Sequence, residues 1–376
     1  MAKYNILYID DDASKHGLEQ IQPMIDTLEE SDELKIHPFQ SGPFDKISES
    51  LIKIINDFDA IIFDYQLDDR ANDEGERGNM KAPVLAQHLR TEITNTERSL
   101  KDIPFILCST NEKLQKSFTS DSTSHDLFDL KFKKDSSNLL LVTKRIRALV
   151  EGYNSIEREN DLSNLLQNNY DSLDNRILSK FLSDKKKLPA HEYANSILKD
   201  LVYINGPLIG HKTLAARLGI DIENSPHWPA LLENYFMPSK YSGVFSGGWD
   251  KWWMDSVNDI FLELTGSSLS SIDARERVSL LTEKTECKEL KLSDLIEGCR
   301  SYRYWTICKS YDKPLDPREA FRAYTKKEPK PWQDHIYISK PGALDRVGFE
   351  DGLEIHPNDY DRYRLTIENL KNEGTK

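Results

Sequence analysis

The first feature of the sequence that could take part in chemistry is an apolar run that ends in a carboxylate. Residues 60–64 (AIIFD) have the composition of a buried central strand of a parallel sheet, and Asp64 stands at its carboxyl end. Parallel sheets hold their ligands at that edge. A single Asp there decides little, because Asp also favours turns. Asp64 is therefore a candidate functional residue only if other strand ends supply chemical partners.

Three other apolar runs also end in polar residues: the pair Asp10-Asp11 follows residues 5–9, Ser109 follows residues 103–108, and Lys133 follows residues 127–132. In one parallel sheet these side chains would meet Asp64. Clustered carboxylates repel one another unless a cation lies among them, and oxygen ligands favour a hard ion such as Mg²⁺. The Ser109 hydroxyl and the Lys133 ammonium would then hold the oxygens of a phosphoryl group on Asp64.

Alternating strands and amphipathic helices are expected to position these residues. The expected strands are 4–9, 34–39, 60–64, 103–108 and 127–132, and the expected helices are 17–30, 44–58, 84–92, 112–118 and one from about 136. Five strands alternating with helices predict a doubly wound α/β domain with a five-stranded parallel sheet over residues 1–150.

Over residues 4 to 150 the chain resembles the receiver domain of bacterial two-component response regulators. That family has an acidic pair after the first strand, a phospho-acceptor Asp after the third, Ser or Thr after the fourth and Lys after the fifth, and all are present in order. The resemblance implies the flavodoxin-like strand order. It also implies a Mg²⁺ site formed by Asp10, Asp11, Asp64 and the main-chain carbonyl of Gln66.

The same resemblance implies a role for each site residue. Asp64 would accept a phosphoryl group from a histidine kinase, Ser109 would be the switch hydroxyl, and Lys133 would bridge to the phosphate. Gln66 and Asn111 occupy the flanking positions that tune phosphoryl lifetime in receivers. Because both are amides able to orient water, the acyl phosphate is expected to turn over on its own.

The chain departs from the family pattern at three places. Lys134 stands where a Pro usually follows the lysine, and Leu130 stands where an aromatic switch residue is common. The segment 68–79 is longer and more charged than the usual loop after the acceptor. Two interpretations of it stay open: a solvated surface loop, or a lid that screens the site from a phosphatase or recognises one kinase.

Residues 151–188 are expected to form a helical linker. A stripe of apolar residues at helical spacing continues past residue 150 and resumes after a polar patch at 158–161, which predicts one or two long connecting helices. Such helices would pair with a second subunit as a coiled coil or pack on the C-terminal domain of the same chain.

Residues 189–376 are predicted to form a mainly helical C-terminal output or interaction domain with some strand, and no family is recognised there. A helix-turn-helix interpretation of 205–235 is opposed by the second helix, which offers Trp228 and Leu231 where base contacts need polar side chains. The aromatic residues of 241–264, among them Trp249, Trp252 and Trp253, are expected on one face of a helix in the domain core.

Composition limits the partners. The net charge of −13 argues against broad nucleic-acid binding, because a DNA-binding surface must neutralise phosphates. No stretch approaches the roughly 20 apolar residues of a membrane span, so a cytoplasmic protein is expected. Beyond the phosphorylation and dephosphorylation of Asp64, no enzyme activity is expected.

Three functions follow from these expectations. The first is a signalling protein in which phosphorylation of Asp64 controls binding to a protein effector or a second subunit. The second is a phosphate sink that drains phosphoryl groups from a partner histidine kinase. The third is a transcription regulator that uses residues 205–235.

Overall fold

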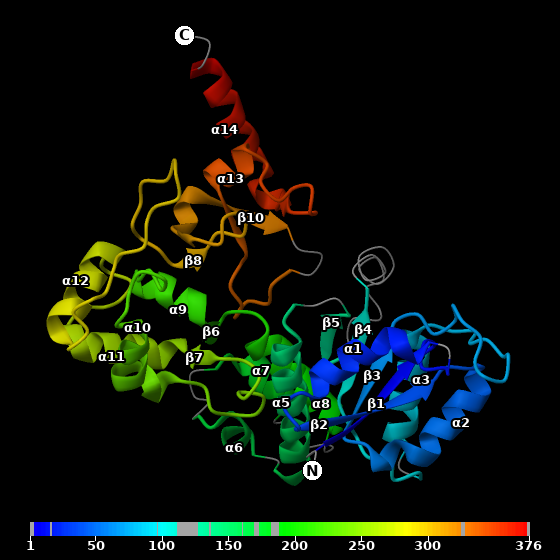
Figure 1. Ribbon diagram of the computed structural model, residues 1–376. Helices are drawn as coiled ribbons and strands as arrows, with labels where there is room; N and C mark the ends of the chain where they lie inside the picture. The colour runs from blue at the N-terminus through cyan, green and yellow to red at the C-terminus, as the bar shows by residue number, and fades with distance from the viewer. Residues whose placement is uncertain are drawn as a thin grey trace. The chain divides into compact units, whose positions relative to one another are not determined.

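The computed structural model describes residues 4–15, 17–95, 97–110, 127–134, 137–159, 161–168, 173–181, 188–324 and 328–373 (Figure 1). The chain forms two compact units. Unit 1 comprises Met1–Asp171, Asn175–Lys199 and Ser242–Trp249, and unit 2 comprises Ser172–Asp174, Asp200–Tyr241 and Asp250–Lys376. The expected division at residues 150 and 188 stays a prediction about domains.

Unit 1 is built on one five-stranded sheet. Its strands are β1 (Tyr4–Asp10), β2 (Leu34–Gln40), β3 (Ala60–Asp64), β4 (Phe105–Ser109) and β5 (Leu130–Lys133). All neighbouring strands are parallel, and the order is β2-β1-β3-β4-β5 (Figure 1). This confirms the predicted doubly wound sheet with the flavodoxin-like order.

Helices cover both faces of the sheet. α2 (Phe44–Ile54) and α3 (Ala82–Thr94) pack together over a core that includes Ile61 and Phe63, while α1 (Leu18–Glu29) and α5 (Leu139–Arg158) cover the other face. There Cys108 of β4 contacts Met24 of α1. The alternation of side chains along buried strands explains why the runs are apolar throughout. The helix expected at 112–118 lies outside the described residues.

The expected long linker helix is interrupted. α5 ends at Arg158 because Glu159 is extended, and a short helix, α6 (Leu162–Leu166), starts anew with Asp161 as its N-cap. Two further helices, α7 (Asn175–Phe181) and α8 (Ala190–Ile197), follow, and α8 packs against α5. Phe245 also covers α5, so closely that a Cβ at Gly152 would lie 2.2 Å from its ring. The apolar stripe of α5 is therefore buried within unit 1.

Unit 2 is a mixed α/β region. Its first part contains β6 (Leu208–Gly210), α9 (His211–Leu218), α10 (Trp228–Leu231), β7 (Lys251–Trp253), α11 (Met254–Thr265) and α12 (Ala274–Lys284). Its last part contains β8 (Thr306–Ile307) paired with β9 (Pro314–Leu315), a sheet of β10 (Ala320–Tyr324), β11 (Tyr337–Ser339) and β12 (Glu354–Ile355), and the helices α13 (Lys340–Leu344) and α14 (Tyr360–Glu373).

The expected helix through the tryptophans is wrong at its start. Trp252 and Trp253 belong to β7, which pairs with β6, and helix α11 begins only at Met254. Both tryptophans are buried, as the core interpretation predicted. Their spacing fits a helical face by coincidence, because two adjacent buried residues are equally compatible with a short strand covered on both faces.

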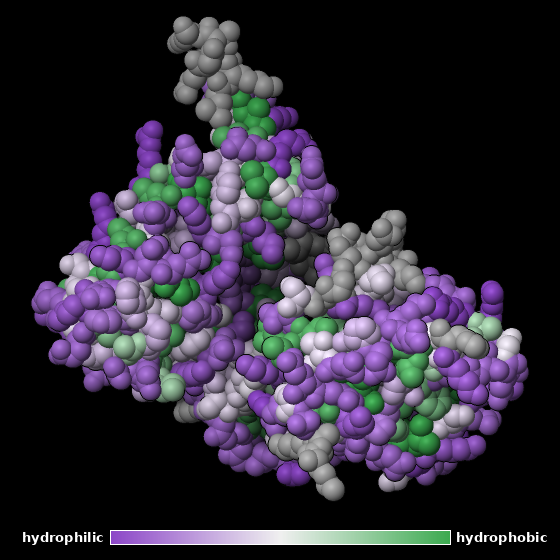
Figure 2. Space-filling model, in the orientation of Figure 1, coloured by the Kyte–Doolittle hydropathy of each residue, from purple (hydrophilic) through white to green (hydrophobic). Residues whose placement is uncertain are grey.

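Among the residues that the structure describes, no helix combines the length and apolar composition needed to cross a membrane. On the face shown in Figure 2, hydrophilic side chains predominate and hydrophobic ones are scattered in small groups.

Candidate functional site

The carboxyl ends of three central strands bring together three predicted site residues. Asp10 ends β1, Asp64 ends β3 and Ser109 ends β4. The strand register aligns the ends of β1, β3 and β4, so the three residues lie at the same edge of the sheet. All three side chains are buried. This edge is where doubly wound sheets bind their ligands.

A lysine lies between the two carboxylates, but it is Lys134 rather than Lys133. Lys134 Nζ lies 2.6 Å from Asp10 Oδ2 and 2.9 Å from Asp64 Oδ1, whereas Lys133 is exposed. Pairing with β4 continues past the strand, because the Lys134 backbone N–H donates to Ser109 O at 3.0 Å. Neighbouring side chains point to opposite sides of an extended chain. The expected place of Lys133 beside Asp64 is therefore corrected to Lys134.

Asp10 is held on three sides. The Tyr8 hydroxyl donates a short hydrogen bond to Asp10 Oδ2, and the Asp12 backbone N–H donates to Oδ1 at 2.8 Å. Lys134 provides the third contact. Burial raises the pKa of Tyr8 well above its usual value, with further increases from nearby acidic groups including Cys108 and Asp10, so the phenol keeps its proton. Tyr8 is thus the hydrogen-bond donor that holds the Asp10 carboxylate in place.

Asp64 carries an unusually basic carboxylate. Burial raises its pKa to about 7 and the neighbouring Asp10 adds to the rise, while Lys134 and the Gln66 backbone N–H, 2.9 Å from Oδ2, oppose it. Burial lowers the pKa of Lys134, but the attraction of Asp64 and Asp10 outweighs burial and leaves the pKa raised. The lysine is therefore a permanent cation beside an acid that titrates near neutral pH.

Three consecutive acids form a cluster beside this pair. Carboxylate oxygens of Asp10, Asp11 and Asp12, one from each, all lie within 4.8 Å of one another, and we call these residues the acidic cluster. Burial raises the pKa of Asp11 to about 6, helped by its acidic neighbours and opposed by the Arg70 backbone N–H. An all-oxygen donor set of this kind fits a hard divalent cation such as Mg²⁺.

Asp12 was not predicted as a site residue, although its place as the third Asp in a row is visible in the sequence. Asp64, a predicted metal ligand, does not belong to the acidic cluster, and its oxygens contact Lys134 and the Gln66 N–H. The Gln66 side-chain amide donates to Asp68. Metal binding by the Gln66 carbonyl stays a prediction, and Asn111 lies outside the described residues.

The hydroxyl of Ser109 is buried and has no hydrogen-bond partner among the described residues. Its Oγ makes no hydrogen bond to any residue that the structure describes, and the side chain is fully buried. Leaving such a group unsatisfied costs about 1–3 kcal/mol. The hydroxyl is therefore available to donate to an oxygen atom of a group bound at this edge.

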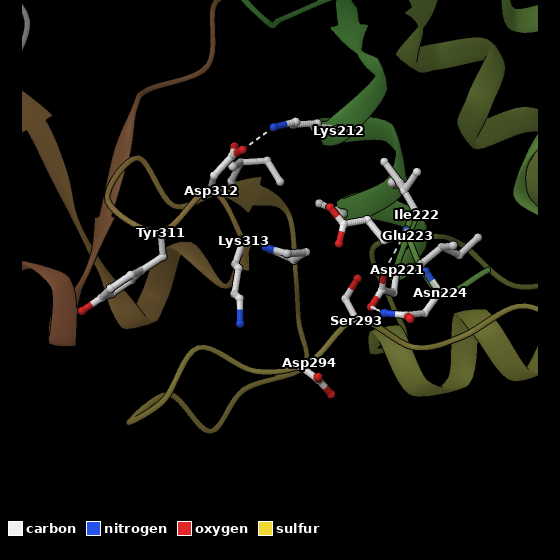
Figure 3. A pocket seen from close by; sticks show the side chains of 15 residues that line it. Lys212, Asp221, Ile222, Glu223, Asn224, Ser293, Asp294, Tyr311, Asp312 and Lys313 are labelled. Carbon is white, nitrogen blue, oxygen red and sulfur yellow. Dashed lines mark hydrogen bonds and ion pairs between the residues drawn. The ribbon is translucent and has the colours of Figure 1, made fainter. Parts of the chain in front are cut away.

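Unit 2 contains a separate cavity of about 470 Å³ (Figure 3). Its lining mixes both signs of charge: Lys212, Lys313, Asp221, Glu223, Asp294 and Asp312. Lys212 and Asp312 form an ion pair with each other, and the Asp221 carboxylate accepts the backbone N–H groups of Glu223 and Asn224. These interactions use several of its charges internally, so the cavity does not identify a ligand class.

The basic residues of α9 are also used internally, which weighs against the helix-turn-helix interpretation. Arg217 is buried, its guanidinium lies 2.5 Å from Asp334, and its Nε donates to Trp305 O at 3.1 Å. In α10, Trp228 is buried and donates to His211 at 2.7 Å. Helices whose charges are paired inside the unit leave few groups for DNA phosphates.

No protein-family model matches the chain, and no curated protein matches it. Among solved structures, the chain is similar to the crystal structure of a response regulator receiver domain protein from Clostridium thermocellum. The two are 14% identical, the match covers 42% of this chain and 99% of that chain, and the TM-score is 0.29. The rest of the chain is unassigned.

Proposed function

We propose that unit 1 is a receiver that accepts a phosphoryl group on Asp64 from a histidine kinase. The observation that carries this proposal is the meeting of Asp64, Lys134 and the unpartnered Ser109 hydroxyl beside the acidic cluster at one strand edge. A nucleophilic carboxylate, a cation and a free hydroxyl donor are the groups that phosphoryl transfer requires.

The proposed step transfers the phosphoryl group of a phosphohistidine to Asp64. An Asp64 carboxylate oxygen attacks the phosphorus of a phosphohistidine, so an O–P bond forms and the P–N bond breaks with its electron pair left on the imidazole. Lys134, already 2.9 Å from Asp64 Oδ1, binds a phosphoryl oxygen, and Ser109 Oγ donates to another. Removing one such donor typically lowers a rate by about 10²–10³.

The acidic cluster would hold a divalent cation. Asp11 and Asp12 are the better candidates for direct ligands, because Asp10 is already engaged by Tyr8 and Lys134. When bound, Mg²⁺ would neutralise charge on the transferring group. Asp10 then serves to position Lys134 between the acids and the acceptor.

For the output, we propose phosphorylation-controlled binding to a protein effector or a second subunit. The net charge of −13 and the internal pairing of α9 support this over a transcription regulator acting through 205–235. A phosphate sink is the second candidate. If Asp64→Asn abolishes pathway output, the switch is supported, and if it makes the pathway overactive, the sink is. A DNA mobility-shift assay tests the third possibility.

Acetyl phosphate offers a test without the kinase. In Mg²⁺, the full chain should form a phosphoprotein that a phosphate-affinity gel retards and hydroxylamine cleaves. Asp64→Asn should abolish the retarded band, and Asp57→Asn, which changes an exposed acid, should not. We expect the band to decay by hydrolysis, and a lifetime of many hours would contradict the proposed turnover. Phosphorylation of Asp64→Asn equal to wild type would contradict the proposal itself.

A further inference from the structure

The loop between β3 and α3 (residues 65–81, here the β3–α3 loop) has a defined structure. Backbone bridges join Gln66 to Lys81 and Ala71 to Arg77. At its tip, Asn72 Oδ1 accepts the backbone N–H groups of Glu74 and Glu76 at 3.1 and 2.8 Å. A loop closed by its own bridges and turn is more than a solvated connection, which favours the interpretation as a lid.

The base of this loop is anchored on unit 1. A Cβ at Gly78 would lie 2.0 Å from Leu67 O, and Ser41 Oγ donates to the same carbonyl at 2.6 Å. Lys46 of α2 forms an ion pair with Glu76 at 2.6 Å. These contacts fix where the loop leaves the sheet, so its first half passes the acidic cluster in a defined position.

Arg70 links the β3–α3 loop to the acidic cluster. Its guanidinium Nη1 lies 2.7 Å from Asp12 Oδ1, and its backbone N–H donates to Asp11 Oδ2 at 2.8 Å. Its Nη2 also donates to Gln20 of α1 at 3.1 Å. One loop residue thus engages an oxygen on each of two carboxylates that are candidate ligands for a divalent cation.

A divalent cation and Arg70 therefore need the same oxygen atoms. A cation bound by Asp11 and Asp12 would be repelled by the guanidinium, and it would compete with the Arg70 backbone N–H for Asp11 Oδ2. Both partners stabilise the acidic cluster by neutralising it, but they cannot do so through the same atoms at once.

We propose that Arg70 is a counter-ion that holds the β3–α3 loop over the acidic cluster and is displaced when a divalent cation binds. This inference rests on the proposed function, because it concerns the cation of the same site. Its consequence is that the loop opens when the site is loaded.

Two variants with the same change in charge test the proposal. Arg70→Gln removes the counter-ion, and Arg77→Gln removes an exposed guanidinium of the same loop that makes no ion pair with the described residues. Mn²⁺ binding to the unphosphorylated full chain would be followed by electron paramagnetic resonance, and Mg²⁺ by competition. Arg70→Gln should bind Mn²⁺ about two- to fivefold more tightly, as expected when an exposed competing ion pair is removed. Arg77→Gln should stay within about twofold of wild type.

Hydrogen exchange of the 68–79 amides gives a second readout that does not depend on activity. Mg²⁺ should accelerate exchange in the wild type, whereas Arg70→Gln and Asp12→Asn should exchange fast already without metal. The double variant should show little additional effect, because both changes break one contact.

The possible outcomes separate the two proposals. If the wild type binds metal but Arg70→Gln binds it equally or more weakly, or if Mg²⁺ leaves loop exchange unchanged, the displacement of Arg70 is contradicted and the receiver function stands. If neither protein binds Mg²⁺ or Mn²⁺, both proposals fail.

Discussion

The ammonium group of Lys134, the residue after β5, lies 2.9 Å from Asp64 Oδ1 at the end of β3. The same nitrogen is 2.6 Å from Asp10 Oδ2, so one half-buried cation is shared by the proposed acceptor and by an acid of the neighbouring strand. Because the three residues are far apart in the chain, their contact depends on the parallel sheet. The site is therefore a product of the fold rather than of a local motif.

The two consecutive lysines provide a matched pair of variants. Lys134→Ala should slow phosphorylation of Asp64 by acetyl phosphate by about 10²-fold, because it removes the cation beside the acceptor. Lys133→Ala, at the exposed neighbour, should stay within about twofold. Initial rates from phosphate-affinity gels measure both. An equal loss of phosphorylation rate in the two variants would contradict a specific role for Lys134.

The raised pKa values predict how pH and metal act together. Burial raises the pKa of Asp64 to about 7 and that of Asp11 to about 6. Above about pH 4, the folded protein binds more protons at these groups than the unfolded chain does, so their contribution to stability is lost as pH rises toward 7. Mg²⁺ binding by the acidic cluster requires the unprotonated form of Asp11 and offsets part of that loss.

We therefore expect Mg²⁺ to raise the melting temperature more at about pH 8 than at about pH 5.5, where protons compete with the metal. Differential scanning fluorimetry at both pH values measures the two increments. Asp64→Asn should reduce the destabilisation of the metal-free protein at the higher pH. Equal increments at both pH values would show that protons do not compete with Mg²⁺ for Asp11 in this range.

The unpartnered hydroxyl of Ser109 predicts opposite effects on two states of the protein. Ser109→Ala should leave the melting temperature of the unmodified protein unchanged or slightly higher, because the hydroxyl makes no hydrogen bond to the part of the chain that the structure describes. It should weaken binding of the phosphoryl mimic BeF₃⁻ about tenfold, as expected for a lost hydrogen bond to an anion.

Ser41→Ala is the matched control for this change, since Ser41 Oγ is also buried but donates to Leu67 O at 2.6 Å. It should lower the unfolding free energy by about 1 kcal/mol. A Ser109→Ala protein as destabilised as Ser41→Ala would mean that Ser109 has a structural partner.

A buried ion network at the opposite ends of β4 and β5 is expected to dominate the stability of unit 1. Arg90 of α3 contacts Asp102 at 2.7 Å and Asp129 at 3.2 Å, and Tyr153 of α5 donates to Asp129 at 2.8 Å. Arg90→Met would leave Asp129 buried without its cation and should lower the unfolding free energy by about 3–5 kcal/mol.

Arg98→Met, which removes the ion pair between the exposed Arg98 and the half-buried Glu92, should cost under about 1 kcal/mol. Urea unfolding followed by circular dichroism compares the two variants. Similar urea midpoints for Arg90→Met and the wild type would show that the ion network does not contribute to the unfolding free energy.

The site residues that follow from residue type at strand ends could be predicted from the sequence. Apolar runs ending in Asp10, Asp64 and Ser109 identify three parallel strands and the edge at which they meet. The choice between Lys133 and Lys134 depends on which way each side chain turns as β5 ends. Lys133 and Lys134 are the same residue type, so only the backbone geometry determines which of them faces Asp64.

Other features depend on packing that pattern does not specify. The stripe of α5 predicts a buried helical face but not its partner, and in the structure α8 and Phe245 cover it within unit 1. Arg70 lies in a charged loop whose composition is typical of solvated segments. Its contacts with Asp11 and Asp12 arise from the folded position of the β3–α3 loop.

The central claim is that Asp64 forms an acyl phosphate. After reaction with acetyl phosphate in Mg²⁺, borohydride reduction converts a phosphorylated aspartate to homoserine, which peptide mass spectrometry locates. We predict homoserine at position 64 alone, in the wild type and in Lys133→Ala, with a strongly reduced yield in Lys134→Ala. Homoserine at another position, or none in a protein shown to bind Mg²⁺, would contradict the account.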